Sequence, residues 1–261
     1  MPSSPLRTHP VVRGFDRAAE AYERGRPDYP RAAVAYLGQR LHLGPGRTVV
    51  VLGSGTGKFT RALAPLGAAR VAVEPIAGMR RVFAQEVPEV PVLPGVAEAI
   101  PLPGGFADAV VVAQAFHWFR PRPALREIAR VLGPNGGLGL IWNLRDESVD
   151  WSRRLTELLA PYRRAAHAPG SRDRQWQRVF RSPACPFGPT HFRSFPHVQR
   201  APRAAFVERV LSVSVIAVLP SPERRQVAAE VRRILDRDPA TRGRAIVALP
   251  YRTEVYWARK K

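Results

Sequence analysis

An apolar run that ends in three glycines constrains this chain more than any other feature. Residues 48–52 read Thr-Val-Val-Val-Leu, and Gly53, Gly55 and Gly57 follow at alternate positions. A segment of helical pattern then leads to a second apolar run, which stops on Glu74, 21 positions after Gly53 (74 − 53). Glycines in such a turn let a ligand approach the backbone, and a ribose-binding acid is expected roughly 20 residues further on. The pattern therefore predicts a nucleoside-binding strand, turn, helix and strand.

The residues around the glycines discriminate among three nucleoside ligands. A P-loop needs G-x-x-x-x-G-K-[ST], but Leu52 stands where its first glycine belongs and Phe59 where Ser or Thr is needed. A dinucleotide fingerprint needs G-x-G-x-x-G, and here the third glycine arrives one residue early. The remaining candidate is S-adenosylmethionine, which carries a methionine tail in place of phosphates. A glycine-rich turn without a ligand is the plainer alternative.

Strand and helix patterns alternate on both sides of this turn. Strands are predicted at 47–52, 70–73, 90–93, 107–113 and 137–142, and helices at 14–42 (two, separated by Pro27 and Pro30), 58–66, 76–86 and 123–132, the last with Gly133 as its C-cap. The continuous apolar run 107–113 is typical of a parallel strand covered on both faces. Such alternation predicts a doubly wound α/β sheet.

Beyond residue 147 the pattern changes. Helices are predicted at 148–182, 202–211 and 222–235, and extended segments at 187–200 and 245–257.

Six short segments occur in an order that resembles a known family. They lie at 15–30, 53–57 with 73–75, 95–103, 113–119, 142–147 and 249–254. Together they resemble class I S-adenosylmethionine-dependent methyltransferases, in the small-molecule branch of bacterial trans-aconitate-type (methyltransferase type 11-like) proteins. The resemblance implies an α/β fold with a doubly wound, seven-stranded Rossmann-like sheet and a helical cap. It divides the chain into an N-terminal helical lid (1–42), a cofactor-binding core (43–147), a basic helical cap with one core strand (148–243) and a final antiparallel core strand (244–261).

The same resemblance implies a cofactor site at and beyond the carboxyl ends of the strands, where ligands bind in open α/β sheets. Its cofactor-binding residues would be Tyr22, Arg26, Gly53, Ser54, Gly55, Gly57, Glu74, Pro75, Ala97, Glu98 and Gln114.

His117 follows the fourth predicted strand and is the first candidate for a catalytic base. Its alternative role is structural, as part of a turn packed against the sheet. The residues that would shape the acceptor pocket are Tyr29, Trp118, Trp142, Asn143 and Arg145, although aromatic residues at these spacings fit a core equally well. No metal is predicted, because the remaining histidines lack metal-ligand spacing and have no cysteine partners nearby.

Two positions depart from the family pattern. Val51 stands two residues before the first glycine, where relatives usually carry an acid that helps to hold the methionine end of the cofactor. Loss of such a charge-assisted hydrogen bond corresponds to about ten- to a hundredfold in affinity. Arg120 stands where relatives often carry an acid after His-Trp-Phe. The change at Val51 motivates a second hypothesis, in which the fold catalyses a cyclisation or elimination instead of methyl transfer.

The net charge of +20 is unevenly distributed. Residues 1–150 hold 18 basic and 13 acidic residues (+5), and residues 151–261 hold 23 and 8 (+15). This excess beyond the cofactor core is compatible with an anionic small-molecule substrate, an acidic partner protein, nucleic acid or a merely solvated surface. A nucleic-acid methyltransferase is disfavoured, because residues 114–117 do not match the Asx-Pro-Pro-aromatic segment of base N-methylating enzymes and no proline precedes Cys185.

The remaining features bear on where the protein works. A single cysteine fits a reducing compartment. Residues 1–10 lack the apolar core of a signal peptide, and the apolar stretch 211–219 is too short to span a bilayer. We expect a cytoplasmic protein that acts in secondary metabolism without a membrane partner; the sequence leaves its oligomeric state open.

Overall fold

The computed structural model describes residues 19–166 and 174–261. In these ranges seven strands form one sheet in the order β3-β2-β1-β4-β5-β7-β6. The strands are β1 (Thr48–Leu52), β2 (Ala69–Val73), β3 (Val92–Leu93), β4 (Ala107–Ala113), β5 (Leu132–Arg145), β6 (His191–Pro202) and β7 (Ile246–Arg259). The first five are parallel, whereas β7 runs antiparallel to both β5 and β6. The doubly wound, seven-stranded α/β sheet is confirmed, and its final strand, β7, is the antiparallel one.

Helices cover both faces of this sheet, because alternate residues of each buried strand point to opposite sides. Val49 and Val51 pack in one cluster with α3 (Arg31–Leu41) and α4 (Lys58–Ala62), and α5 (Ala77–Glu86) packs on the same side against Ala72. Val50 and Leu52 belong to the cluster on the other face, with α6 (Pro121–Val131).

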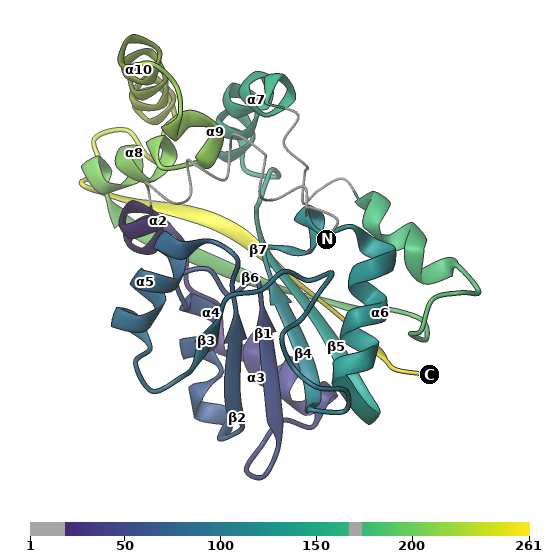
Figure 1. The fold of residues 1–261 in the computed structure, drawn as a ribbon. Helices are drawn as coiled ribbons and strands as arrows, with labels where there is room; N and C mark the ends of the chain where they lie inside the picture. Colours follow the sequence, from purple (N-terminus) through teal and green to yellow (C-terminus); the bar gives the residue numbers. More distant parts are fainter. Residues whose placement is uncertain (1–18, 167–173) are drawn as a thin grey trace.

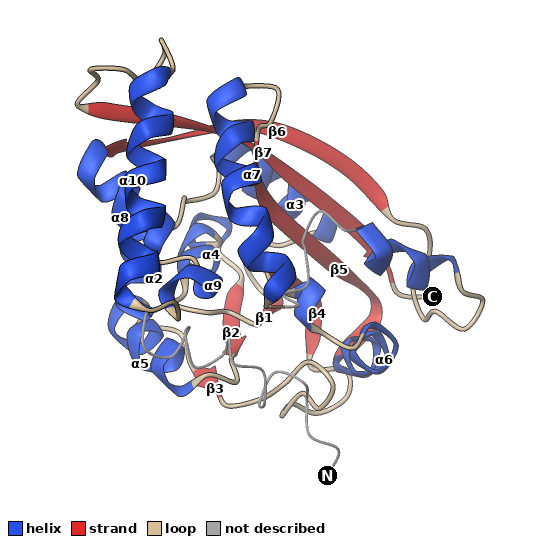
Figure 2. Ribbon diagram, turned by 90° about the horizontal axis from the view of Figure 1, so that it is seen from above, coloured by secondary structure: helices blue, strands red, loops and turns tan. Residues whose placement is uncertain are grey.

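A second group of helices forms the cap. It contains α7 (Asp150–Ala165), α8 (Arg203–Leu211), α9 (Ser214–Ala217) and α10 (Ser221–Arg237), which share an apolar cluster with the first half of β7. These helices gather at one end of the sheet, away from α3 and α6 (Figure 1). Seen from above, β6 and β7 pass behind α7 and α10 and continue toward the C-terminus (Figure 2). The cap therefore lies over one end of the parallel strands. None of the helices in the described ranges is long and apolar enough to cross a membrane.

Three local features differ from the prediction. The helix expected at 58–66 stops at Ala62, and a 3-10 turn, η2 (Ala64–Leu66), follows, because Pro65 cannot donate a helical hydrogen bond. Helix α6 begins at Pro121 and is capped by Leu132 in extended geometry, so Gly133 already belongs to β5 and is not the cap. Helix α9 was not predicted. The helix proposed from residue 14 falls partly on residues 1–18, outside the described residues; the described part is α2 (Ala19–Gly25).

Candidate active site

Two adjoining cavities lie between the glycine turn and the cap. The larger has a volume of about 410 Å³ and is lined by the glycine turn, the carboxyl ends of β4 and β5, and residues of α7, α8 and α9. The smaller, of about 90 Å³, lies between the glycine turn and the residues that follow β2 and β3. They share the residues Tyr22, Gly53, Gly55, Ala113, Gln114 and Trp118. A ligand that passes these six residues can occupy both cavities.

Glu74 connects the two strands that carry the predicted nucleoside site. One carboxylate oxygen accepts a hydrogen bond from the backbone N–H of Gly55 (2.9 Å), and the other accepts one from Ile76 (2.9 Å). The side chain lines the smaller cavity and is only 4% exposed. Burial raises the pKa of Glu74, partly opposed by the two backbone hydrogen bonds and by the charge of Arg80. Each carboxylate oxygen has two lone pairs, so both can still accept a hydroxyl.

The three glycines of the turn have different surroundings. At Gly55 (φ +58°) a Cβ would meet no atom within 4 Å, so its open side faces free space. At Gly57 (φ +94°) a Cβ would lie 2.5 Å from Cγ2 of Val87, and this residue lines neither cavity. Gly57 is thus needed for close packing of the α4 start against α5, whereas Gly53 and Gly55 border both cavities.

Helix α2 is fastened to the glycine turn by a buried carboxylate. Glu23 accepts a hydrogen bond from Thr56 (2.5 Å) and forms ion pairs with Lys58 (3.2 Å) and Arg61 (2.6 Å). Hydrogen bonds and neighbouring positive charge lower the pKa of Glu23 against the opposing effect of burial. This fastening brings Tyr22, one residue earlier, and Arg26, after the helix, to the wall of the larger cavity.

Several predicted acceptor residues meet around Gln114. This residue has a left-handed backbone (φ +59°) at the end of β4 and shares a side-chain hydrogen bond with the partly buried Tyr29. Asn143 donates to the backbone oxygen of Asp28 (3.0 Å) and accepts from Thr253 (2.6 Å). Arg145 and Trp118 also line the larger cavity.

His117 lies in the larger cavity, but its surroundings do not suit a base. Its Nδ1 accepts a long hydrogen bond from the Trp142 indole N–H (3.4 Å), which leaves Nε2 as the protonated, donating nitrogen of the neutral ring. Burial, together with the positive charge of Arg163, lowers the pKa of His117 to about 3. The geometry favours a neutral hydrogen-bond donor.

Three residues that were predicted for the site line neither cavity: Glu98, Trp142 and Gly57. Glu98 accepts a hydrogen bond from the backbone N–H of Arg120 (2.7 Å), at the start of α6, and it lines neither cavity. Trp142 is 1% exposed and stacks on Trp176 (centroids 4.9 Å apart). Gly57 serves packing, as described above. Pro75 and Ala97 line the smaller cavity.

The larger cavity also contains residues that the sequence did not indicate. They are Thr56, Lys58, Thr156, Arg163, Arg209, Ser214 and Tyr251. Lys58 and Thr56 adjoin the glycine turn, so proximity in sequence could have suggested them. Arg163 and Arg209 lie on cap helices with many arginines, and no local signal separates them from the others.

Val51 has no access to either cavity. Its side chain is fully buried in the apolar cluster that includes Phe59 and Leu63, on the sheet face covered by α3 and α4. It is absent from the lining of both cavities. The position where relatives usually carry an acid is thus part of the core in this chain.

Comparison with known proteins places this geometry in a family. Residues 50–140 match the methyltransferase domain family. The chain is 38% identical over 239 residues to an uncharacterized methyltransferase of Mycobacterium tuberculosis, covering 92% of each protein. It is 34% identical over 251 residues to an uncharacterized methyltransferase-like protein of Schizosaccharomyces pombe, covering 96% of each. A putative type II methyltransferase from Anaeromyxobacter dehalogenans has the same fold (24% identity, TM-score 0.64, 90% and 97% coverage).

The chain belongs to the class I S-adenosylmethionine-dependent methyltransferases. The cofactor of this methyltransferase is S-adenosylmethionine, which supplies an electrophilic methyl group on a sulfonium. Two orphaned polar groups fit such a ligand. Oγ of Ser54 and Nε of Arg26 are buried without a hydrogen-bond partner among the described residues. Ser54 and Arg26 line the larger cavity beside the glycine turn. The amine and carboxylate of the cofactor's methionine part would supply their missing hydrogen-bond partners there.

Proposed function

We propose that this methyltransferase transfers the methyl group to a small-molecule acceptor, in the cytoplasm and in secondary metabolism. The observation that carries the proposal is the junction of the two cavities. Glu74, Pro75 and Ala97, which line the smaller one, would contact the adenosine part, and the shared residues Gly53 and Gln114 would border the reacting sulfonium. The larger cavity would then receive the acceptor under α7, α8 and α9.

The size of this space supports a small acceptor. A cavity of about 410 Å³ falls in the usual range of small-ligand sites, roughly 300–1,000 Å³. Within it the chain's residues would exclude water and hold the acceptor roughly 3–3.5 Å from the methyl carbon, and such orientation supplies about 7–11 kcal/mol.

A transfer assay tests the proposal. Purified protein is incubated with cofactor labelled in the methyl group and with a cell extract. The extract has been separated into its macromolecules and its low-mass fraction, and the two are recombined, so that both kinds of acceptor are present. We expect label in low-mass organic products. Label confined to nucleic acid or protein, or no binding of S-adenosylhomocysteine by calorimetry, would refute it.

The neutral state of His117 leads to a pH prediction. Because its pKa is about 3, turnover should show no step from this residue between pH 5 and 8. His117→Gln keeps a donor near Nε2 and should retain turnover within about tenfold, whereas His117→Ala should lose more. A pH–rate profile whose step near pH 6.5 vanishes in His117→Gln would instead identify His117 as the base.

A further inference from the structure

The larger cavity has a strongly one-sided charge. Among the described residues that line it, five are cationic and none is Asp or Glu: Arg26, Lys58, Arg145, Arg163 and Arg209. Lys58 is neutralised by Glu23 and Asp28. Arg209 is the most deeply buried of the five, at 7% exposed, and it forms no ion pair with any described residue.

The Arg209 guanidinium has an incomplete set of partners. It donates to the phenol oxygen of Tyr251, and it lies over the Tyr251 ring, 5.4 Å from its centroid. Its Nε is buried and has no hydrogen-bond acceptor among the described residues. Burial and the positive charges of Arg26 and Arg145 lower the pKa of Arg209. Burying a charged guanidinium beside other positive charges costs folding free energy unless an anion pairs with it.

Neighbouring residues hold this guanidinium in place. The Tyr251 hydroxyl donates to Oε1 of Gln199 (3.4 Å), and Nε2 of Gln199 donates to the carbonyl of Gly25 (3.2 Å). A Cβ at Gly25 would lie 3.3 Å from both Cα and Cγ of Arg209, so α2 packs closely on α8 at this point. Tyr251 and the end of α2 therefore fix the direction in which Arg209 faces the cavity.

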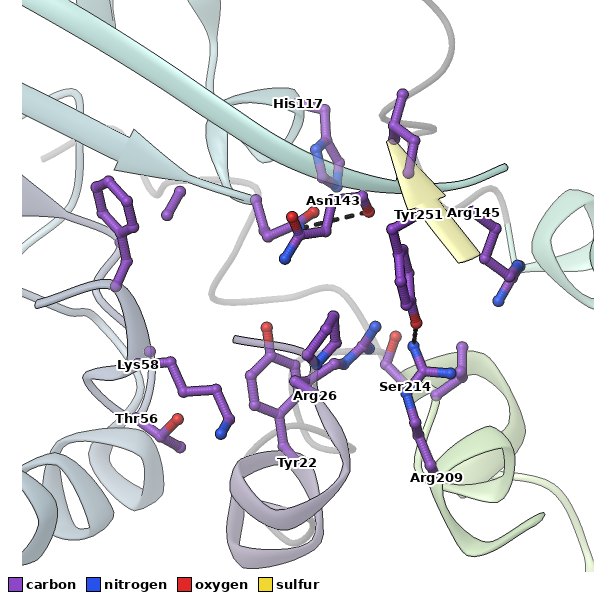
Figure 3. Close-up of a pocket in the computed structure, with 18 of the residues that line it drawn as sticks. Tyr22, Arg26, Thr56, Lys58, His117, Asn143, Arg145, Arg209, Ser214 and Tyr251 are labelled. Atoms are coloured by element: carbon purple, nitrogen blue, oxygen red, sulfur yellow. Dashed lines mark hydrogen bonds between the residues drawn. The ribbon is translucent and has the colours of Figure 1, made fainter. Parts of the chain in front are cut away.

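Arg209 lies on the acceptor side. Figure 3 shows Lys58 and Thr56 on one side of the cavity, next to the glycine turn, and Arg209, Ser214 and Arg145 on the opposite side. Tyr22 and Arg26 project between the two groups. The smaller cavity, which would hold adenosine, adjoins the glycine turn and does not include Arg209. The cofactor's methionine carboxylate would thus be held by Arg26 Nε and Ser54 Oγ, which lack a hydrogen-bond partner among the described residues.

We propose that the methyl acceptor is an anion whose carboxylate or phosphate group binds Arg209, positioned by Tyr251, with Arg145 and Arg163 adding positive charge. This inference rests on the proposed function, since it names the chemical class of the acceptor in the same cavity. Arginine suits such a group because its planar N–H donors match carboxylate and phosphate oxygens in pairs.

The test uses simple anions as probes on the full chain saturated with S-adenosylhomocysteine. Succinate and inorganic phosphate are titrated by calorimetry at fixed ionic strength, with succinamide as the uncharged control. We expect the wild type to bind at least one anion and not succinamide. Arg209→Met should weaken anion binding by about ten- to a hundredfold, the worth of one charge-assisted contact. Arg209→Lys should recover part of it.

The matched control is Arg232→Met, which removes one exposed positive charge from α10 outside both cavities. The anion affinity of this variant should stay within about twofold of the wild-type value. Equal anion affinity in Arg209→Met and wild type, or no anion binding by a wild type that does bind S-adenosylhomocysteine, would overturn the inference alone. A loss of S-adenosylhomocysteine affinity in Arg209→Met would assign this residue to the cofactor's carboxylate instead. Failure of the wild type to bind S-adenosylhomocysteine would refute the proposed function itself.

Discussion

Val51→Asp is expected to destabilise the folded protein by about 4 kcal/mol at pH 7. The site is fully buried among apolar side chains on the α3 and α4 face of the sheet. Burial there should raise the pKa of an aspartate by about 3–5 units, to neutrality or above, and each unit from roughly 4 to 7 costs about 1.4 kcal/mol. This is a large fraction of the 5–15 kcal/mol that is typical of a folded domain. Urea unfolding followed by circular dichroism measures it.

The pH dependence of stability separates the effect of the negative charge in Val51→Asp from the effect of its altered side-chain shape. When the folded-state pKa of an aspartate is raised, its contribution to stability is complete below the unfolded-state pKa and is lost as pH rises through the folded-state pKa. Val51→Asp should therefore approach the uncharged, isosteric Val51→Asn near pH 4 and fall well below it at pH 7. Val51→Asn should show the same deficit at both pH values.

The same variant decides between two interpretations of Val51. If the missing acid were only a lost cofactor contact, Val51→Asp would fold normally and bind S-adenosylhomocysteine about ten- to a hundredfold more tightly. The burial of Val51 away from both cavities leads us to expect no gain in affinity. A normally stable Val51→Asp with tighter binding would contradict this account.

Glu74→Gln is expected to weaken S-adenosylhomocysteine binding by at least about a hundredfold. The ionised carboxylate can accept two ribose hydroxyls while it holds the N–H groups of Gly55 and Ile76. Two charge-assisted hydrogen bonds contribute about 1.5–3 kcal/mol each, and 1.4 kcal/mol is about tenfold. The amide also places an N–H donor against one of these backbone donors, which loosens the turn. Isothermal calorimetry measures the affinity.

Two controls accompany Glu74→Gln. Glu89→Gln removes an acid paired with Arg70 outside both cavities and should leave the affinity unchanged. In the wild type, affinity should fall as pH drops toward the Glu74 pKa, which burial raises above its usual 4.5, because the protonated carboxyl accepts fewer hydrogen bonds; Glu74→Gln should lack this dependence. An unchanged affinity in Glu74→Gln would remove Glu74 from the cofactor site.

The described part of the chain shows which features local sequence could predict. The strand at 107–113 agrees with β4 residue for residue, because a short continuous apolar run is typical of a parallel strand covered on both sides. The meeting of Gly55 and Glu74 was also predictable. Parallel strands that are adjacent in the sheet end at the same edge, so residues just beyond β1 and β2 must be neighbours.

What the sequence by itself determined is the α/β alternation and the nucleoside-binding turn with its acid. Only the tertiary structure decided which side chains reach the cavities. Trp142 and Asn143 are consecutive in β5, but strand alternation sends the first into the core and the second to the cavity wall. Arg209 and Tyr251 meet from α8 and β7 across 42 positions, because packing of the cap on the sheet, and no local pattern, brings them together.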